Sequence, residues 1–267
     1  MVTATLRYLV PTDEKPIYHA SAGGADAQMR IGAEFDDCDM EIADARQLSP
    51  APTLDSYGFE RRNHTTAVSD FYQLAGQQSL YEQELRDLVL AAVGGRDAIV
   101  FDHTLRSDSP DIREQRNTRE AASVIHNDYT DASAERRLRE LVDTAEADLY
   151  LQHRYAIINV WRAIKAPAYH SPMALSDART LSPYDLVASE RRAAERIGEL
   201  ELVIFNPEHR WYFFPALARN EVLLIKTFDS ATDGRARRCV HTAFNNPQAP
   251  EDAPPRESIE SRLLVFF

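Results

Sequence analysis

The spacing of hydrophobic positions changes about halfway along the chain. Residues 70–93 carry apolar side chains at helical spacing and are followed by Gly94 and Gly95, which predicts an amphipathic helix with a glycine stop. Residues 134–148 show a second helical pattern that is richer in charge. Beyond them, short apolar runs bounded by proline and polar residues predict strands. The expected strands are residues 155–161, 202–205, 211–214, 221–228, 239–244 and 261–267.

The N-terminal part of the chain keeps neither pattern for long. Residues 5–10 predict one strand, but residues 12–62 are polar with scattered prolines, which predicts an irregular arm with short strands. We therefore expect a single domain over residues 1–267, with the irregular arm at about 1–62 and a strand-rich core at about 97–267.

The order of the expected helices and strands limits the fold classes that the chain could adopt. Residues 98–101 add a short strand, and the charged residues 106–119 predict an exposed loop. Residues 182–185 begin with serine and proline, which predicts a helix start. Helices early in the chain and many short strands late in it favour a mainly β fold with flanking α-helices. We expect a double-stranded β-helix core of the jelly-roll or cupin-like type, because that fold has an open-mouthed cavity.

Charge and composition exclude several classes of protein. The formal net charge is −12 and the isoelectric point is about 5.1, which argues against binding to nucleic acid or to an anionic membrane. Two cysteines are too few for a disulfide scaffold. No apolar stretch approaches the roughly eighteen residues of a membrane span, and the N-terminus lacks a targeting pattern. We expect a cytoplasmic protein that acts on a small molecule.

One short motif organises the expected chemistry. His126 and Asp128 are two residues apart, so both side chains leave an extended strand on the same side. With His241 as a third ligand from a late strand, they would form a two-histidine, one-carboxylate face that leaves part of the coordination sphere of a ferrous ion open. By itself, His-x-Asp is common in helix caps and surface turns. His209 is a competing metal candidate, although its place beside a proline turn favours a hydrogen-bonding role.

A second motif follows the last of these histidines. Arg256 and Ser258 lie on one side of an expected strand, where the guanidinium fork and the hydroxyl could bind the distal carboxylate of a dicarboxylic keto acid. The order His-x-Asp, distant histidine, Arg-x-Ser is that of 2-oxoglutarate-dependent iron oxygenases. Asn159 and Trp161 could face the same cavity, or could instead be capping and core residues. A surface ion pair with Glu257 or Glu260 is the alternative for Arg256, and Arg262 or Arg238 would then be the candidate anchor.

Five blocks of sequence stand out together: residues 157–162, 206–212, 226–230, 241–244 and 255–260. They resemble one family, the group of fungal and bacterial proteins similar to gibberellin desaturase and to the smaller component of the cephamycin methoxylase. The resemblance runs from about residue 55 to the C-terminus. Members usually carry a proline after the Trp-Arg pair, whereas Ala163 stands here.

The resemblance implies a function and its site residues. Members are non-heme Fe(II) oxygenases with a double-stranded β-helix fold, which use 2-oxoglutarate and O2 as co-substrates. They carry out hydroxylation, desaturation or a related C–H oxidation of secondary metabolites, including terpenoid-derived ones. By resemblance, His126, Asp128 and His241 bind the metal, and Arg256 with Ser258 binds 2-oxoglutarate.

Two other functions fit the same residues. A non-catalytic subunit of this fold could support an active partner, although it would have no physical need to keep the metal and co-substrate motifs. A zinc hydrolase could use the same three ligands, but it would leave Arg256 and Ser258 without a task. We also expect a homodimer, because the irregular arm needs a surface to pack against.

Overall fold

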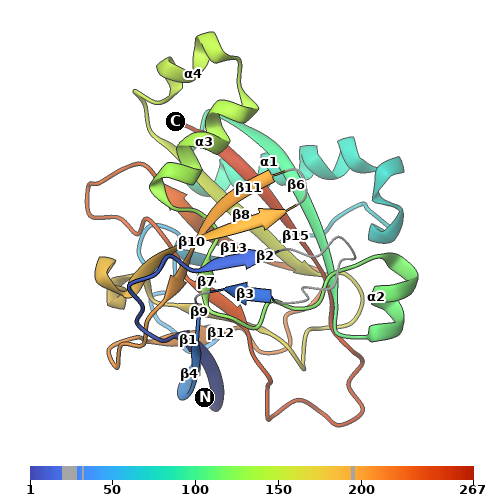
Figure 1. Cartoon of the computed structure of the whole chain (residues 1–267). Coiled ribbons are helices and arrows are strands. Elements are labelled where there is room, and N and C mark those ends of the chain that lie inside the picture. Colours follow the sequence, from blue (N-terminus) through green and yellow to red (C-terminus); the bar gives the residue numbers. More distant parts are fainter. Residues whose placement is uncertain (20–28, 32, 194–195) are drawn as a thin grey trace.

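Long-range strand pairing organises the chain into two sheets that face each other (Figure 1). The computed structural model describes residues 1–19, 29–31, 33–193 and 196–267. Within these ranges one sheet has ten strands and the other has five. In spatial order, the larger sheet contains β1 (Val2–Leu9), β4 (Phe35–Asp44), β12 (Trp211–Phe213), β9 (Met173–Ser176), β14 (His241–Ala243), β7 (His126–Asn127), β11 (Arg196–Val203), β10 (Leu186–Ala193), β2 (Ile17–His19) and β3 (Met29–Ile31). The smaller sheet contains β5 (Phe59–Asn63), β13 (Glu221–Asp229), β8 (Tyr155–Ala163), β15 (Glu257–Phe266) and β6 (Asp97–Ser107).

Strand β8 lies in the middle of the smaller sheet and is buried on both faces. Because side chains alternate along a strand, Ile158 and Val160 point to one face, and Asn159 and Trp161 point to the other. The first pair packs in the hydrophobic cluster beneath helix α1 (Gln78–Val93). The second face looks toward the larger sheet, so polar side chains on it lie between the two sheets.

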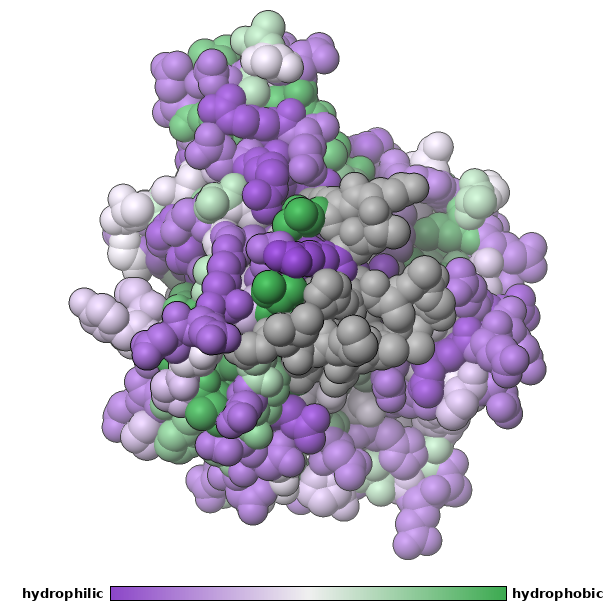
Figure 2. Space-filling view, in the orientation of Figure 1, coloured by the Kyte–Doolittle hydropathy of each residue, from purple (hydrophilic) through white to green (hydrophobic). Residues whose placement is uncertain are grey.

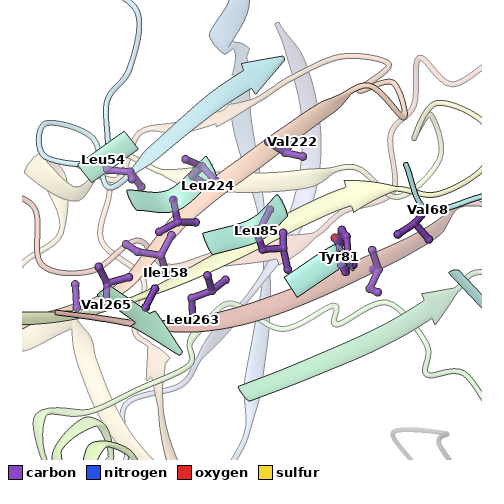
Figure 3. Packing of buried hydrophobic residues seen from close by; sticks show 14 of the residues in the cluster. Leu54, Val68, Tyr81, Leu85, Ile158, Val222, Leu224, Leu263 and Val265 are labelled. Atoms are coloured by element: carbon purple, nitrogen blue, oxygen red, sulfur yellow. The ribbon is translucent and has the colours of Figure 1, made fainter. Parts of the chain in front are cut away.

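Helix α1 covers the outer face of the smaller sheet (Figure 3). Its Tyr81 and Leu85 are fully buried and pack in one cluster with Ile158 and Leu263. The helix ends at Gly94, whose φ of 67° is the left-handed conformation that glycine adopts most readily. The predicted helix and its glycine stop are therefore confirmed, but the helix begins at Gln78 rather than at residue 70, because residues Phe71–Gly76 form a separate 3-10 helix.

We expect Leu85→Ala to lower the free energy of unfolding by about 2–5 kcal/mol, since it leaves a cavity between α1 and the sheet. Leu80→Ala is the matched control, because Leu80 lies on the same helix and is 47% exposed. Urea denaturation of both variants measures the difference. Equal loss of stability in the two variants would contradict this packing.

The residues 106–119, expected to form an exposed loop, contain helix α2 (Pro110–Arg116). The Ser109 hydroxyl accepts a hydrogen bond from the backbone N–H of Ile112, and proline takes the first helical position. The loop prediction was wrong because Ser-Pro is also a helix start signature.

The single helix expected over residues 134–148 is two helices, α3 (Asp131–Leu141) and α4 (Thr144–Tyr150). The chain is extended at Val142, between them. The break allows Leu138 and Ala147 to pack in the same hydrophobic cluster as the last strand. The remaining short turns are the 3-10 helices Ala45–Gln47, Phe71–Gly76, Ala178–Thr180 and Pro183–Asp185, the last with the serine cap predicted from the sequence.

The N-terminal arm expected to be irregular instead supplies strands to both sheets. Strand β1 pairs with β4 along its whole length, β4 continues the larger sheet beside β12, and β5 pairs with β13 in the smaller sheet. In β4, Cys38, Met40 and Ile42 alternate with acidic residues and pack in one hydrophobic cluster. The polar residues of β4 therefore belong to a strand that is buried on one face only, which the sequence pattern did not reveal. Residues 20–28 of the expected arm lie outside the described ranges.

The face drawn in Figure 2 is mostly hydrophilic, and its hydrophobic residues form small separate patches. This surface agrees with the strongly negative net charge of the chain. In the described part of the chain, no helix is both long enough and apolar enough to cross a lipid bilayer.

Candidate active site

Three side chains predicted as metal ligands converge on the inner face of the larger sheet. Strand β7 pairs with β14 in a register that sets His126 directly opposite His241. Their ring centroids are 4.7 Å apart. Asp128 follows β7 immediately, and the three potential ligand atoms all lie within 4.8 Å of one another. Residues more than a hundred positions apart in sequence thus become cross-strand neighbours.

Both histidines have one ring nitrogen already bonded to the backbone. Nδ1 of His126 donates to the carbonyl oxygen of Val124 over 2.7 Å, and Nδ1 of His241 donates to that of Cys239 over 3.0 Å. A ring whose Nδ1 carries the proton has its lone pair on Nε2. Burial, with a smaller contribution from His241, lowers the pKa of His126 to about 4. Its ring is therefore neutral at pH 7 and able to bind a metal.

Asp128 is held by two side chains of the facing sheet. Nε of Arg262 donates to Oδ2 over 2.9 Å, and Nδ2 of Asn159 donates to the same oxygen over 2.7 Å. Oδ1 is then directed toward His126, with 3.6 Å between Oδ1 and Nε2. Burial raises the pKa of this carboxyl, but the positive charge of Arg262 outweighs burial and holds the pKa well below its usual range. Asp128 is thus ionised and presents one oxygen.

This donor set fits a ferrous ion. Two neutral imidazoles and one carboxylate converge, and the remaining polar atom of each is engaged by the protein, which fixes the orientation of the ligands. Arg262, which the sequence suggested only as an alternative co-substrate anchor, also binds Asp102 and Glu260. The sequence signal was its spacing, since Arg262 is four residues after Ser258 and so lies on the same face of β15 as that residue.

Arg256 immediately precedes β15 and Ser258 lies near the start of that strand; both are almost completely buried, at 2% and 1% exposure. Nη1 of Arg256 donates to the carbonyl oxygen of Ser171 over 2.6 Å, and its guanidinium lies 5.6 Å from the centroid of Trp161. Arg256 is therefore no surface ion pair, and burial lowers its pKa to about 10. Arg256 Nε lies 4.0 Å from Oδ1 of Asp108, too far for a hydrogen bond, so this nitrogen and Ser258 Oγ are buried donors without a hydrogen-bond partner among the described residues.

Asn159 and Trp161 lie on the same face of β8 and each contacts one of the residues singled out by the sequence. Asn159 donates to Asp128, and the guanidinium of Arg256 lies over the ring of Trp161. His209 bonds to Asp185 over 3.0 Å and to Tyr8 over 3.2 Å, so the hydrogen-bonding role favoured by the sequence is confirmed.

A cavity of about 370 Å³ borders the three converging side chains. His126 and Asp128 line it, together with Arg262 and the strand β6 residues Thr104 and Arg106. Arg256 and Ser258 are not among its lining residues, although Ser258 is the cross-strand neighbour of Arg106. The cavity therefore gives a small molecule access to His126 and Asp128.

One protein family and several known proteins are similar to this chain in sequence. Residues 6–266 match the family described as "Oxidoreductase/YMDC permease-like domain". The hydroxylase/desaturase efuI of Hormonema carpetanum is 31% identical over 248 residues, which cover 85% of this chain and 82% of that protein. The alpha-ketoglutarate-dependent dioxygenase tstK of Talaromyces stipitatus is 29% identical over 237 residues, which cover 85% of this chain and 84% of that protein.

A solved structure confirms the expected fold class. The iron and alpha-ketoglutarate-dependent endoperoxidase NvfI superposes with a TM-score of 0.87 at 24% identity, and the match covers 99% of this chain and 97% of that one. Alpha-ketoglutarate is another name for 2-oxoglutarate. The chain therefore belongs to this oxidoreductase family and is a non-heme Fe(II)/2-oxoglutarate-dependent oxygenase, with Fe(II), 2-oxoglutarate and O2 as its cofactor and co-substrates.

Proposed function

We propose that His126, Asp128 and His241 hold the catalytic iron. The observation that carries this assignment is the convergence of their three ligand atoms within 4.8 Å. When bound, ferrous iron supplies the activation of O2, with 2-oxoglutarate oxidised to succinate and CO2. The chain's own task is to keep the two imidazoles neutral and one carboxylate oxygen directed at the metal.

We further propose that Arg256 and Ser258 hold the distal carboxylate of 2-oxoglutarate. Their burial excludes water, and their unpartnered Nε and Oγ atoms supply one charged and one neutral donor. Trp161 would act indirectly, because its ring supports the guanidinium plane of Arg256. Asn159 would orient Asp128 instead of touching the co-substrate.

The reaction we propose is a C–H oxidation of a small secondary metabolite, by hydroxylation, desaturation or a related outcome. The relative efuI is named a hydroxylase/desaturase, and the fold neighbour NvfI is named an endoperoxidase. The finer resemblance to gibberellin desaturase and the cephamycin methoxylase component, with terpenoid-derived substrates, belongs to this proposal. A cytoplasmic location is also part of this proposal.

We also propose that residues 1–267 form a single oxygenase domain, since strands from the N-terminal part extend both sheets. The homodimer stays a prediction. The packing need that suggested it is met within the chain, where β1 and β4 pair with each other. Size-exclusion chromatography with light scattering measures the oligomeric state.

The proposed function predicts how activity depends on the metal. Protein reconstituted with ferrous iron without oxygen should bind about one iron per chain and form succinate once 2-oxoglutarate and O2 are added. Zinc-loaded protein should form none, because zinc does not change its oxidation state. Metal analysis and succinate measurement check both. Less than about a tenth of an iron per chain would favour the non-catalytic partner subunit, and activity with zinc alone would favour a hydrolase.

A further inference from the structure

The cavity beside the proposed metal ligands is lined by more positive than negative side chains, although the protein as a whole is acidic. Among the described residues, five arginines and three acidic residues line it, although the whole chain has a net charge of −12. The three acids already have partners: Asp102 and Asp128 bind Arg262, and Glu199 binds Lys15. A positive lining that is partly shielded from water attracts anions strongly.

One of these arginines presents a donor without a partner. Arg137 lies on helix α3, and its side chain is only 13% exposed. It forms an ion pair with Glu140 over 2.9 Å, and its guanidinium lies 5.1 Å from the ring centroid of Phe101, which also lines the cavity. Its Nε is buried and has no hydrogen-bond partner among the described residues. Such a donor is costly to leave unsatisfied.

We propose that the substrate of this oxygenase is an organic anion whose carboxylate binds Arg137. The inference deepens the proposed function and rests on it, because it names the class of substrate that enters the same cavity. Phe101, Val124, Leu200 and Leu202 supply an apolar wall for the carbon skeleton. The volume of about 370 Å³ lies within the usual range for small-molecule sites.

The anion at Arg137 is distinct from 2-oxoglutarate. The proposed co-substrate anchor, Arg256, is buried immediately before β15 and outside the lining of this cavity, whereas Arg137 belongs to its lining. Arg262 is already bound to three carboxylates, those of Asp102, Asp128 and Glu260. The other lining arginines, Arg106, Arg119 and Arg191, also have partners, whereas Nε of Arg137 has no hydrogen-bond partner among the described residues. We therefore assign Arg137 to the substrate, and binding there would hold one end of the molecule while the rest extends along the apolar wall.

Matched pairs of acids and amides test this assignment. The probes are 2-naphthoate with 2-naphthamide, and 4-phenylbenzoate with 4-phenylbenzamide, titrated by calorimetry without oxygen into protein loaded with iron and 2-oxoglutarate. For at least one pair we expect the carboxylate to bind at least about tenfold more tightly than the amide, as a charge-assisted hydrogen bond implies. Arg137→Gln should reduce that ratio to about one, and Arg137→Lys should give an intermediate ratio.

Arg136→Gln is the control, because it makes the same charge change on the same helix at an exposed position outside the lining. It should keep the preference for the carboxylate. All variants should melt cooperatively and bind 2-oxoglutarate like the parent. The proposal is overturned if neither carboxylate binds better than its amide, if the preference survives Arg137→Gln, or if Arg137→Gln also loses 2-oxoglutarate.

Failure of the proposed function is a separate result. It would appear as an iron-loaded parent that gives no charge-transfer band with 2-oxoglutarate. The acid and amide titrations, repeated on protein without iron or 2-oxoglutarate, would still decide whether Arg137 is a carboxylate site.

Discussion

Replacing His241 with alanine is expected to abolish oxygen-dependent succinate formation and to lower iron affinity by at least about a hundredfold. The change removes one of three ligands, and losing even a supporting hydrogen bond around a metal ligand typically costs about 10–100-fold. His241 is the cleanest proposed ligand to remove, because among the described residues its ring makes one hydrogen bond, to the backbone carbonyl of Cys239 two residues earlier. Asp128→Ala should be equally inactive but also less stable, since it leaves the buried Arg262 without one of its partners.

Iron content after anaerobic reconstitution and succinate yield per chain are the measurements. His153→Ala is the histidine control, because His153 is exposed and lies outside the site, so its iron content and activity should equal those of the parent. Thermal melting checks that each variant is folded. A His241→Ala protein that binds iron and forms succinate at the parent rate would show that the assignment of the three ligands is wrong.

The second large effect concerns the co-substrate. Arg256→Ala should weaken 2-oxoglutarate binding by about thirtyfold to several thousandfold. Removing one partner of a buried charge pair typically costs about 2–5 kcal/mol, and about 1.4 kcal/mol corresponds to a factor of ten. Arg256 is 2% exposed, so water cannot replace its contact with the carboxylate. Arg256→Lys keeps the charge but loses the planar fork, so a smaller loss is expected.

Anaerobic titration of the iron protein with 2-oxoglutarate, followed by the metal-to-ligand charge-transfer band, measures these losses. Ser258→Ala should cost about 1.5–3 kcal/mol, as one hydrogen bond to a charged group. Arg7→Ala is the control, since Arg7 forms an exposed ion pair with Asp37 on another strand. Iron binding should be unchanged in all of them. If Arg256→Ala binds 2-oxoglutarate as tightly as the parent does, Arg106, the cross-strand neighbour of Ser258, becomes the candidate anchor.

Parts of the fold could be predicted from local sequence because the responsible forces are local. Helix α1 and its end at Gly94 follow from hydrophobic spacing and from the freedom of glycine to adopt a left-handed conformation. Strand β8 follows from a continuous apolar run. The break between α3 and α4 could not be predicted in this way, because it depends on how Leu138 and Ala147 pack against the distant last strand.

The strands that the sequence pattern did not predict share one property, which is their content of charged residues. Strand β10 and its neighbour β11 contain several arginines and glutamates, and β4 carries acidic residues on one face. A strand of this composition is stabilised by backbone pairing with neighbours that come from elsewhere in the chain. The amino-acid composition of such a strand reflects its exposed face, but it does not show which strands pair with it.

The sequence by itself determined which residues we propose for the chemistry. His126 with Asp128, the distant His241, and Arg256 with Ser258 were all identifiable from residue type, order and two-residue spacing. Only the tertiary structure decided how they meet. The pairing of β7 with β14 sets His241 opposite His126, and the facing sheet brings Arg262 and Asn159 to Asp128. Strand register and sheet packing are sums of many weak, long-range contacts, so no local pattern can specify them.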